Sequence, residues 1–210
     1  MNSKISRKLI LTALICFLVF IFIITEILLP GFLVQIDLSI NSFIPSIHNP
    51  SLINISRVID MLFDVIPIVF ISLILSIFLW FRYSKKESAF FALTMIFNAA
   101  VIYLVKEVIQ RARPLNSLLH IGDFAFPSGH STTAVVFFGL LIYVVFLNNK
   151  SRIIKIISVL AGIFMMFLIG FSRIYLNMHW FSDVFGGFVL GGFVLSICLL
   201  IKNFLENKKF

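Results

Sequence analysis

The chain has 210 residues, of which 60% are hydrophobic and only 12% carry a charge. A soluble globular chain is about half apolar and about a quarter charged, so one water-soluble core could not bury this much Phe, Ile and Leu. The composition excludes intrinsic disorder, collagen and secreted disulfide scaffolds, and it predicts an integral membrane protein. Cys16 and Cys198 lie in long apolar runs, which indicates neither a disulfide framework nor a metal site.

Six apolar windows with at most one charge each follow one another along the chain. They cover residues 9–29, 65–81, 89–105, 131–147, 156–171 and 184–201. At 1.5 Å per residue, helices of this length cross most or all of a hydrocarbon core about 30 Å thick. The predicted fold is therefore an all-α integral membrane bundle of six transmembrane helices, in a single domain over residues 1–210. Because six is even, both termini should lie on the same side.

The basic residues are distributed unevenly over the two sides of this predicted bundle. Of the 17 Lys and Arg residues, twelve lie near the termini and in the second and fourth connections, and five lie on the other side. The positive-inside rule places the twelve, and with them both termini, in the cytoplasm. The formal charge of +8 is therefore a signal of topology rather than of nucleic-acid binding. The first segment is too long for a signal-peptide core, so we expect it to be retained as a helix.

Two long connections lie on the side opposite the termini, residues 30–64 and 106–130. The first is rich in proline and apolar residues, and we expect it to form one or two short helices along the outer surface. Its charged residues have a local interpretation, in which Asp60 and Asp64 cap the second membrane helix and pair with Arg57. Its role in function stays open.

The 106–130 connection begins with a basic block, Lys106-Glu107-Val108-Ile109-Gln110-Arg111-Ala112-Arg113-Pro114. Lys106 and Arg113 are seven residues apart, so a helix would bring them onto one face while Arg111 points elsewhere. Such a pair suits an anionic group. The alternative is an interfacial helix whose basic side chains extend to the membrane surface.

A second block, Pro127-Ser128-Gly129-His130, precedes the fourth window. Ser128 is a good N-cap, and Gly129 allows the backbone to approach a ligand closely. The free N–H groups and positive dipole end of this helix face the outer side, which makes it a ready anion site. The alternative is that these residues only cap the helix.

A third block, residues 172–183, lies between the fifth and sixth windows. His179 and Asp183 are four apart and share a face if helical, so the carboxylate can fix the tautomer and orientation of the imidazole. Arg173 supplies a planar fork that suits phosphate oxygens. The alternative is an external loop with a capping aspartate and an isolated histidine.

The three blocks lie at the same predicted membrane face and combine three cations, two histidines, one carboxylate and an oriented helix N-terminus. These groups match a phosphoryl-transfer site with a histidine nucleophile. Three fixed cations can replace the Mg²⁺ that many such sites use. Because no cluster of Asp, Glu, His or Cys has metal-ligand spacing, we expect neither a metal nor another cofactor.

In order and internal spacing, the blocks K-x6-R-P, P-S-G-H and S-R-x5-H-x3-D resemble the signature of the type 2 phosphatidic acid phosphatase superfamily. They occupy residues 106–183. That superfamily includes lipid phosphate phosphatases, bacterial phosphatidylglycerophosphate and undecaprenyl-pyrophosphate phosphatases and, more distantly, vanadium haloperoxidases. Six helices with short termini also resemble its compact bacterial members.

The resemblance implies a role for each residue of the three blocks. His179 would attack phosphorus to form a phosphohistidine, and Asp183 would hold the other ring nitrogen of His179. His130 would protonate the leaving oxygen and then activate the hydrolytic water. Five residues would bind the substrate phosphate: Lys106, Arg113, Ser128, Gly129 and Arg173.

We expect the site to face the outside of a cell membrane. A substrate there keeps its phosphate at the interface and its tail in lipid, which fits lipid phosphates and isoprenoid pyrophosphates. Phosphatidylglycerophosphate and undecaprenyl pyrophosphate are the leading candidates, with phosphatidic acid behind them. The expected partners are this substrate and the bilayer, without nucleic acid or an obligate protein partner.

Two other functions use the same residues. A transporter or scramblase would line a pathway with charges, usually near mid-membrane, whereas the predicted spans contain a single charge, Glu26. A vanadate-dependent haloperoxidase would use the same pocket, but that chemistry does not explain a membrane bundle. Lipid phosphate hydrolysis is therefore the preferred prediction.

Overall fold

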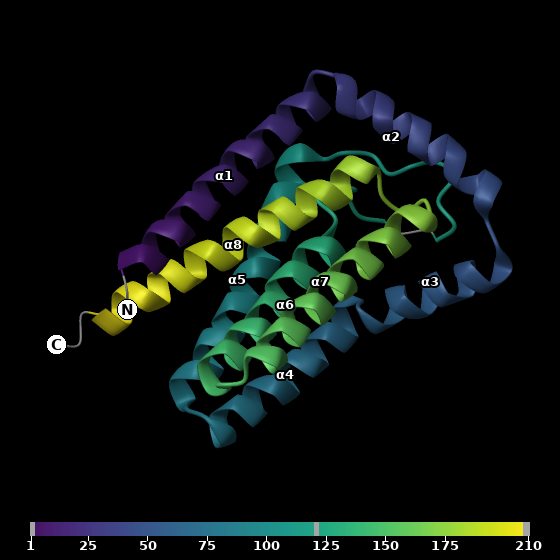
Figure 1. Cartoon of the computed structure of the whole chain (residues 1–210). Helices are drawn as coiled ribbons and strands as arrows, with labels where there is room; N and C mark the ends of the chain where they lie inside the picture. Colours follow the sequence, from purple (N-terminus) through teal and green to yellow (C-terminus); the bar gives the residue numbers. More distant parts are fainter. Residues whose placement is uncertain (1–2, 120–121, 208–210) are drawn as a thin grey trace.

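The computed structural model describes residues 3–119 and 122–207, which form eight α-helices and one short 3-10 helix and contain no strand (Figure 1). The elements in chain order are α1 (Ser3–Leu28), α2 (Phe32–Phe43), η1 (Ile44–Ile47), α3 (Pro50–Leu62), α4 (Val65–Arg82), α5 (Lys85–Ile109), α6 (Gly129–Asn148), α7 (Arg152–Tyr175) and α8 (Phe181–Asn207). Lys208 and Lys209, two of the twelve basic residues assigned to the cytoplasm, lie outside the described residues.

Six of these helices, α1 and α4 to α8, are long and apolar enough to cross a membrane. Each covers one of the six predicted windows, with α1 ending one residue before its window does, so the all-α fold is confirmed. The outward faces of the bundle are strongly apolar; Ile66 and Phe81 on α4, for example, are each more than four-fifths exposed. Such surfaces suit lipid rather than water as the surrounding solvent.

The first turn of α1 and the last turns of α8 lie together at one end of the bundle (Figure 1). Asn203 of α8 donates a hydrogen bond to the hydroxyl of Ser6 in α1, at 2.7 Å. At the opposite end, α2 and α3 connect α1 to α4, as expected for the 30–64 connection. We call this opposite end, which carries α2, η1 and α3, the α2 end.

Polar side chains define where several helices begin. Asp64 accepts a hydrogen bond from the Val65 amide and caps α4, and Ser84 accepts one from the Glu87 amide in α5. These caps satisfy N–H groups that have no partner within the helix. Asp64 is therefore the predicted cap of the second membrane helix.

Helices α6 and α8 pack closely against each other near the α2 end of the bundle. A Cβ atom at Gly187 would lie 2.8 Å from the carbonyl oxygen of Ser128, and one at Gly191 would lie 2.7 Å from that of Thr132. Only glycine allows the two helices to approach this closely at these positions. The first turn of α6 is thereby held against the first turns of α8.

Candidate active site

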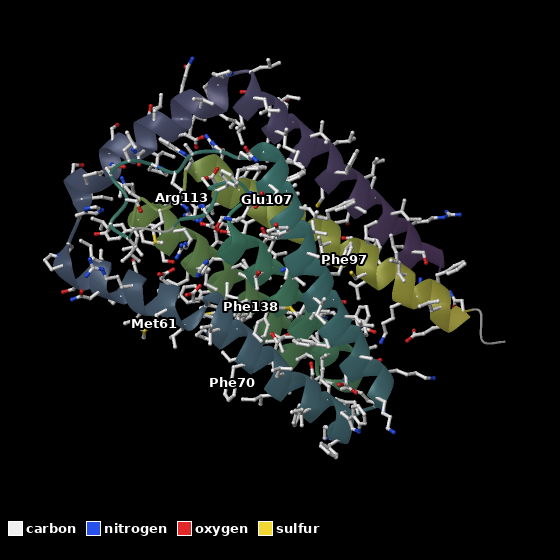
Figure 2. The ribbon with its side chains drawn as sticks, turned by 180° about the vertical axis from the view of Figure 1, so that it is seen from behind. Met61, Phe70, Phe97, Glu107, Arg113 and Phe138 are labelled. Atoms are coloured by element: carbon white, nitrogen blue, oxygen red, sulfur yellow. The ribbon has the colours of Figure 1, made fainter. Side chains whose placement is uncertain are left out.

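The predicted site lies at the α2 end, where α5 ends, α6 begins, α7 ends and α8 begins. Figure 2 shows Arg113 there, in the loop that follows α5. A cavity of about 500 Å³ opens at this place and continues between α4, α5 and α6. Six of the eight predicted site residues line it: Lys106, Arg113, Gly129, His130, Arg173 and His179. Asp183 and Ser128 lie behind its wall.

His179 is 3% exposed and lies between a cation and a carboxylate. Its Nε2 is 3.1 Å from Nη1 of Arg113, and its Nδ1 is 3.4 Å from Oδ2 of Asp183. A guanidinium can only donate, so we assign Nε2 as the unprotonated nitrogen and place the ring proton on Nδ1, facing Asp183. The imidazole is therefore a neutral ring whose Nε2 lone pair accepts from Arg113.

Burial, together with the positive charges of Arg113 and Arg173, lowers the pKa of His179 well below its ordinary value. Removing the ring from water disfavours its charged form, and the two guanidinium groups disfavour it further. His179 is therefore neutral at neutral pH, which is the state that a nucleophile requires.

Asp183 is fully buried and is held on two sides. Its Oδ2 accepts a hydrogen bond from the Trp180 amide at 2.9 Å, and its Oδ1 lies 2.5 Å from Nη1 of Arg111. Arg111 also contacts Asp37 of α2 at 2.7 Å. Arg111 thus contacts two buried carboxylates, Asp37 and Asp183, the second of which lies behind the histidine.

Asp37 links α2 to this arrangement. It is 1% exposed and accepts hydrogen bonds from the amide and the hydroxyl of Ser182, at 2.8 and 2.5 Å. Nothing in the sequence predicts this role, because Asp37 lies in the 30–64 connection at no readable spacing from the three blocks. A chain of contacts therefore connects Asp37, Arg111, Asp183 and His179.

Lys106 and Arg113 do converge, but not by sharing a helix face. Helix α5 ends at Ile109, and Gln110 adopts a left-handed conformation with φ of 48°, so Arg113 lies in the following loop. The expectation of one helical face is wrong, because α5 ends three residues after Lys106 and does not reach Arg113. The amide of Ala125 donates to the Arg111 carbonyl at 2.8 Å and fixes this loop.

Asp123 holds the two cations together. Its carboxylate oxygens lie 2.6 Å from Nζ of Lys106 and 2.5 Å from Nη2 of Arg113. Burial alone would raise the pKa of Asp123, but the hydrogen bond and charge of Lys106 and the charge of Arg113 lower it on balance. An ionised carboxylate therefore lies between two of the cations predicted to bind phosphate. Asp123 belongs to no motif, and sequence analysis missed it.

The start of α6 has the predicted geometry. Ser128 caps the helix, accepting from the amide and the hydroxyl of Ser131 at 3.4 and 3.0 Å. Its own amide donates to the carbonyl of Asp183 at 3.0 Å. Ser128 is fully buried, whereas Gly129 lines the cavity. The helix N-terminus therefore faces the cavity through Gly129.

His130 and Arg173 both contact Asp60 of α3. Nε2 of His130 is 3.3 Å from the carbonyl oxygen and 3.3 Å from Oδ1 of Asp60, and the buried Arg173 forms an ion pair with the same carboxylate. Asp60 was expected to cap a helix and pair with Arg57. That expectation is wrong, because α3 lies along α7 and directs Asp60 into the site.

The donor set suits an anion rather than a metal ion. Among the described residues, no group of three or more His, Cys, Asp and Glu side chains could hold a metal. Nε of Arg173 is buried and has no hydrogen-bond partner among residues 3–119 and 122–207. Lys106, Arg113 and Arg173 all line the cavity, together with Gly129 at the start of α6. This combination can neutralise and orient a phosphate group.

The chain is similar in sequence to known proteins. A family model for the PAP2 superfamily matches residues 87–206. Phosphatidylglycerophosphatase B of Bacillus subtilis is 39% identical over 109 residues, which are 50% of this chain and 52% of that relative. The match thus spans about half the length of that curated relative.

Two solved structures have a similar fold. The first transmembrane PAP2 type phosphatidylglycerolphosphate phosphatase from Bacillus subtilis superposes with a TM-score of 0.83 and 27% identity, covering 94% of this chain and 98% of the other. LpxE of Aquifex aeolicus gives a TM-score of 0.60 and 24% identity, covering 79% and 94%, and shares the fold. On the family match over more than half of its length, the chain belongs to the PAP2 superfamily.

Proposed function

We propose that this protein is a membrane phosphatase that hydrolyses lipid phosphates or isoprenoid pyrophosphates through a phosphohistidine intermediate. The observation that carries the proposal is the environment of His179. A neutral imidazole presents an unprotonated Nε2 to a cation-lined cavity, with a buried carboxylate at its other nitrogen. This is the arrangement that a histidine nucleophile requires.

In the first step, Nε2 of His179 attacks the phosphorus atom and the bond between phosphorus and the leaving oxygen breaks. Asp183 stabilises the positive charge that develops on the ring. His130 gives a proton to the leaving oxygen. In the second step His130 takes a proton from water, the water oxygen bonds to phosphorus, and the bond from phosphorus to Nε2 breaks. Inorganic phosphate and the neutral histidine result.

The cations have to change partners when substrate binds. Before substrate binds, Arg113 donates to His179, and both Lys106 and Arg113 contact Asp123. A phosphate would take these donors, and the free Nε of Arg173 and the amide of Gly129 would complete its shell. Direct contact between the Ser128 hydroxyl and phosphate stays a prediction.

The cavity supports a substrate with an apolar tail. Between the helices, away from the cations, the cavity is lined mainly by apolar side chains of α4 and α5, including Ile68, Val69, Met95 and Ile96.

The basic-residue asymmetry favours an outward-facing site with cytoplasmic termini. The Bacillus sequence match and the Bacillus structure are both phosphatidylglycerophosphate phosphatases by name, which favours that lipid; undecaprenyl pyrophosphate and phosphatidic acid remain the other candidates.

Phosphate release from these three lipids by purified, vesicle-reconstituted protein tests the proposal. We expect release from at least one lipid, in the presence of EDTA, and near-background release by His179→Ala. Glu107→Gln, an exposed charge change on α5, is the matched control and should behave as the wild type. Lipid movement between leaflets without hydrolysis would refute the proposal and favour a transporter or scramblase.

A further inference from the structure

The apolar wall of the cavity is interrupted by polar residues below the phosphate site. Asn98 of α5, Thr133 of α6 and Ser72 of α4 come from three different helices and line the same cavity. Within a membrane bundle, an unpaired polar group is unfavourable, since neither water nor lipid tails satisfy it. These residues therefore need either protein partners or a ligand.

Asn98 is 1% exposed, and its partners are incomplete. Its Nδ2 donates to Oγ1 of Thr133 at 3.1 Å, while its Oδ1 has no partner among the described residues. In this orientation the Thr133 proton remains free to donate. If the amide is turned over, Thr133 donates to the amide oxygen and the amide NH₂ remains free instead. In both orientations the pair keeps an unused hydrogen-bond donor.

Other hydroxyl groups on these helices do have hydrogen-bond partners, unlike the Asn98–Thr133 pair. Thr132, the residue next to Thr133, donates to the carbonyl of Ser128 at 2.9 Å, and Ser88 donates to the carbonyl of Ser76 at 2.7 Å. The hydroxyl of Ser72, by contrast, is buried without a partner in the described part of the chain. The unpaired hydroxyl of Ser72 and the unpaired amide oxygen of Asn98 both lie at the wall of this cavity.

The depth of the pair restricts what it can contact. Thr133 follows Gly129 by four residues, so it lies about 6 Å below the helix N-terminus that faces the phosphate. Ile102 lies beside Gly129, and Asn98 is one turn below Ile102. In a diacylglycerol phosphate, ester carbonyl oxygens lie within a few bonds of the phosphate and accept hydrogen bonds. An isoprenoid chain has no acceptor at this depth.

We propose that Asn98 and Thr133, with Ser72 of α4, form a subsite that donates a hydrogen bond to an ester carbonyl of phosphatidic acid. The inference rests on the proposed phosphatase function and deepens it, because the subsite selects phosphatidic acid over isoprenoid pyrophosphates. The cations and His179 act on the phosphate of either class. The Asn98–Thr133 pair acts on the part of the molecule in which the classes differ.

The test compares three substrates in one preparation of the full-length protein: dioleoyl phosphatidic acid, its dialkyl ether analogue and undecaprenyl pyrophosphate. Thr133→Val and Asn98→Leu should each lower kcat/KM for the ester lipid about 5- to 10-fold, the effect of one neutral hydrogen bond. Turnover of the ether and isoprenoid substrates should not change. The ester-to-ether ratio does not depend on how much protein is folded, so partial misfolding leaves it interpretable.

Thr25→Val is the matched control, because Thr25 lies on the exposed face of α1 and bonds within its own helix at 2.7 Å. It should keep the wild-type ratio. An unchanged ratio in both cavity variants, or an equal loss on all three substrates, would overturn the subsite while leaving the phosphatase intact. Absence of phosphate release by the wild type from these substrates and from phosphatidylglycerophosphate would overturn both proposals.

Discussion

Replacing Asp37 by Asn tests whether helix α2 supports His179, the proposed nucleophile. Asp37 is almost fully buried and accepts from Arg111 at 2.7 Å and from the amide and hydroxyl of Ser182. An asparagine keeps the shape but has one acceptor oxygen, so its NH₂ group must face at least one of these donors. The change therefore leaves a buried donor unsatisfied and Arg111 without its second anion.

The magnitude follows from this count. Breaking a buried ion pair by removing one partner costs about 3–5 kcal/mol. Arg111 retains Asp183, so we expect the lower end, about 3 kcal/mol of folding free energy. We also expect kcat to fall at least about tenfold, which is about 1.4 kcal/mol of transition-state free energy, because Arg111 no longer fixes Asp183 beside His179.

The assay measures kcat and KM for the preferred lipid phosphate and the midpoint of thermal unfolding. Asp37 does not line the cavity, so KM should change little while kcat falls. Glu107→Gln removes one negative charge from an exposed position and is the matched control. Wild-type kcat and thermal stability in Asp37→Asn would refute the argument that α2 supports the site.

Three further predictions concern the cations, the histidines and the helix contact. Asp123→Asn removes the anion that competes with phosphate for the cations, so KM should fall, most at low salt; a raised KM would show that Asp123 assists binding. The pH profile of kcat/KM should be bell-shaped, with limbs set by His179 and His130 together. Its acid limb should lie below pH 6.5, because burial and neighbouring positive charges lower the pKa of His179 and protonation removes its lone pair; an acid limb above 6.5 would contradict this assignment. Gly187→Ala places a methyl group 2.8 Å from the Ser128 carbonyl and should lower both thermal stability and kcat, whereas unchanged values would mean that α6 and α8 adjust freely.

The membrane helices were predictable because their signal is local. Long apolar windows and capping residues lie within the segments that they define, and the structure contains a helix at each. The convergence of Lys106 and Arg113 was also predicted, but for the wrong reason. Gln110 adopts a left-handed conformation and ends α5 early, and the neighbouring residues of the sequence do not distinguish this ending from one more turn of helix.

The acidic partners of the site could not be predicted from the sequence. Asp37, Asp60 and Asp123 lie in connections, and each meets its cation through tertiary contacts rather than through a fixed spacing. Asp37 is 74 residues from Arg111, for example. Their positions depend on how α2, α3 and the loop after α5 fold over the end of the bundle. The three sequence blocks supply the groups that we propose to react, and these carboxylates contact the cations among them.

Trapping the phosphorylated enzyme tests the central claim most directly. Protein mixed rapidly with ³²P-labelled lipid phosphate and quenched in alkali should carry label at His179, located by mass spectrometry of its peptides. The bond should survive alkali and be lost in acid, as expected for phosphorus bound to an imidazole nitrogen. His179→Ala should carry no label and release almost no phosphate. Wild-type phosphate release by His179→Ala, or label at a different residue, would contradict the phosphohistidine mechanism.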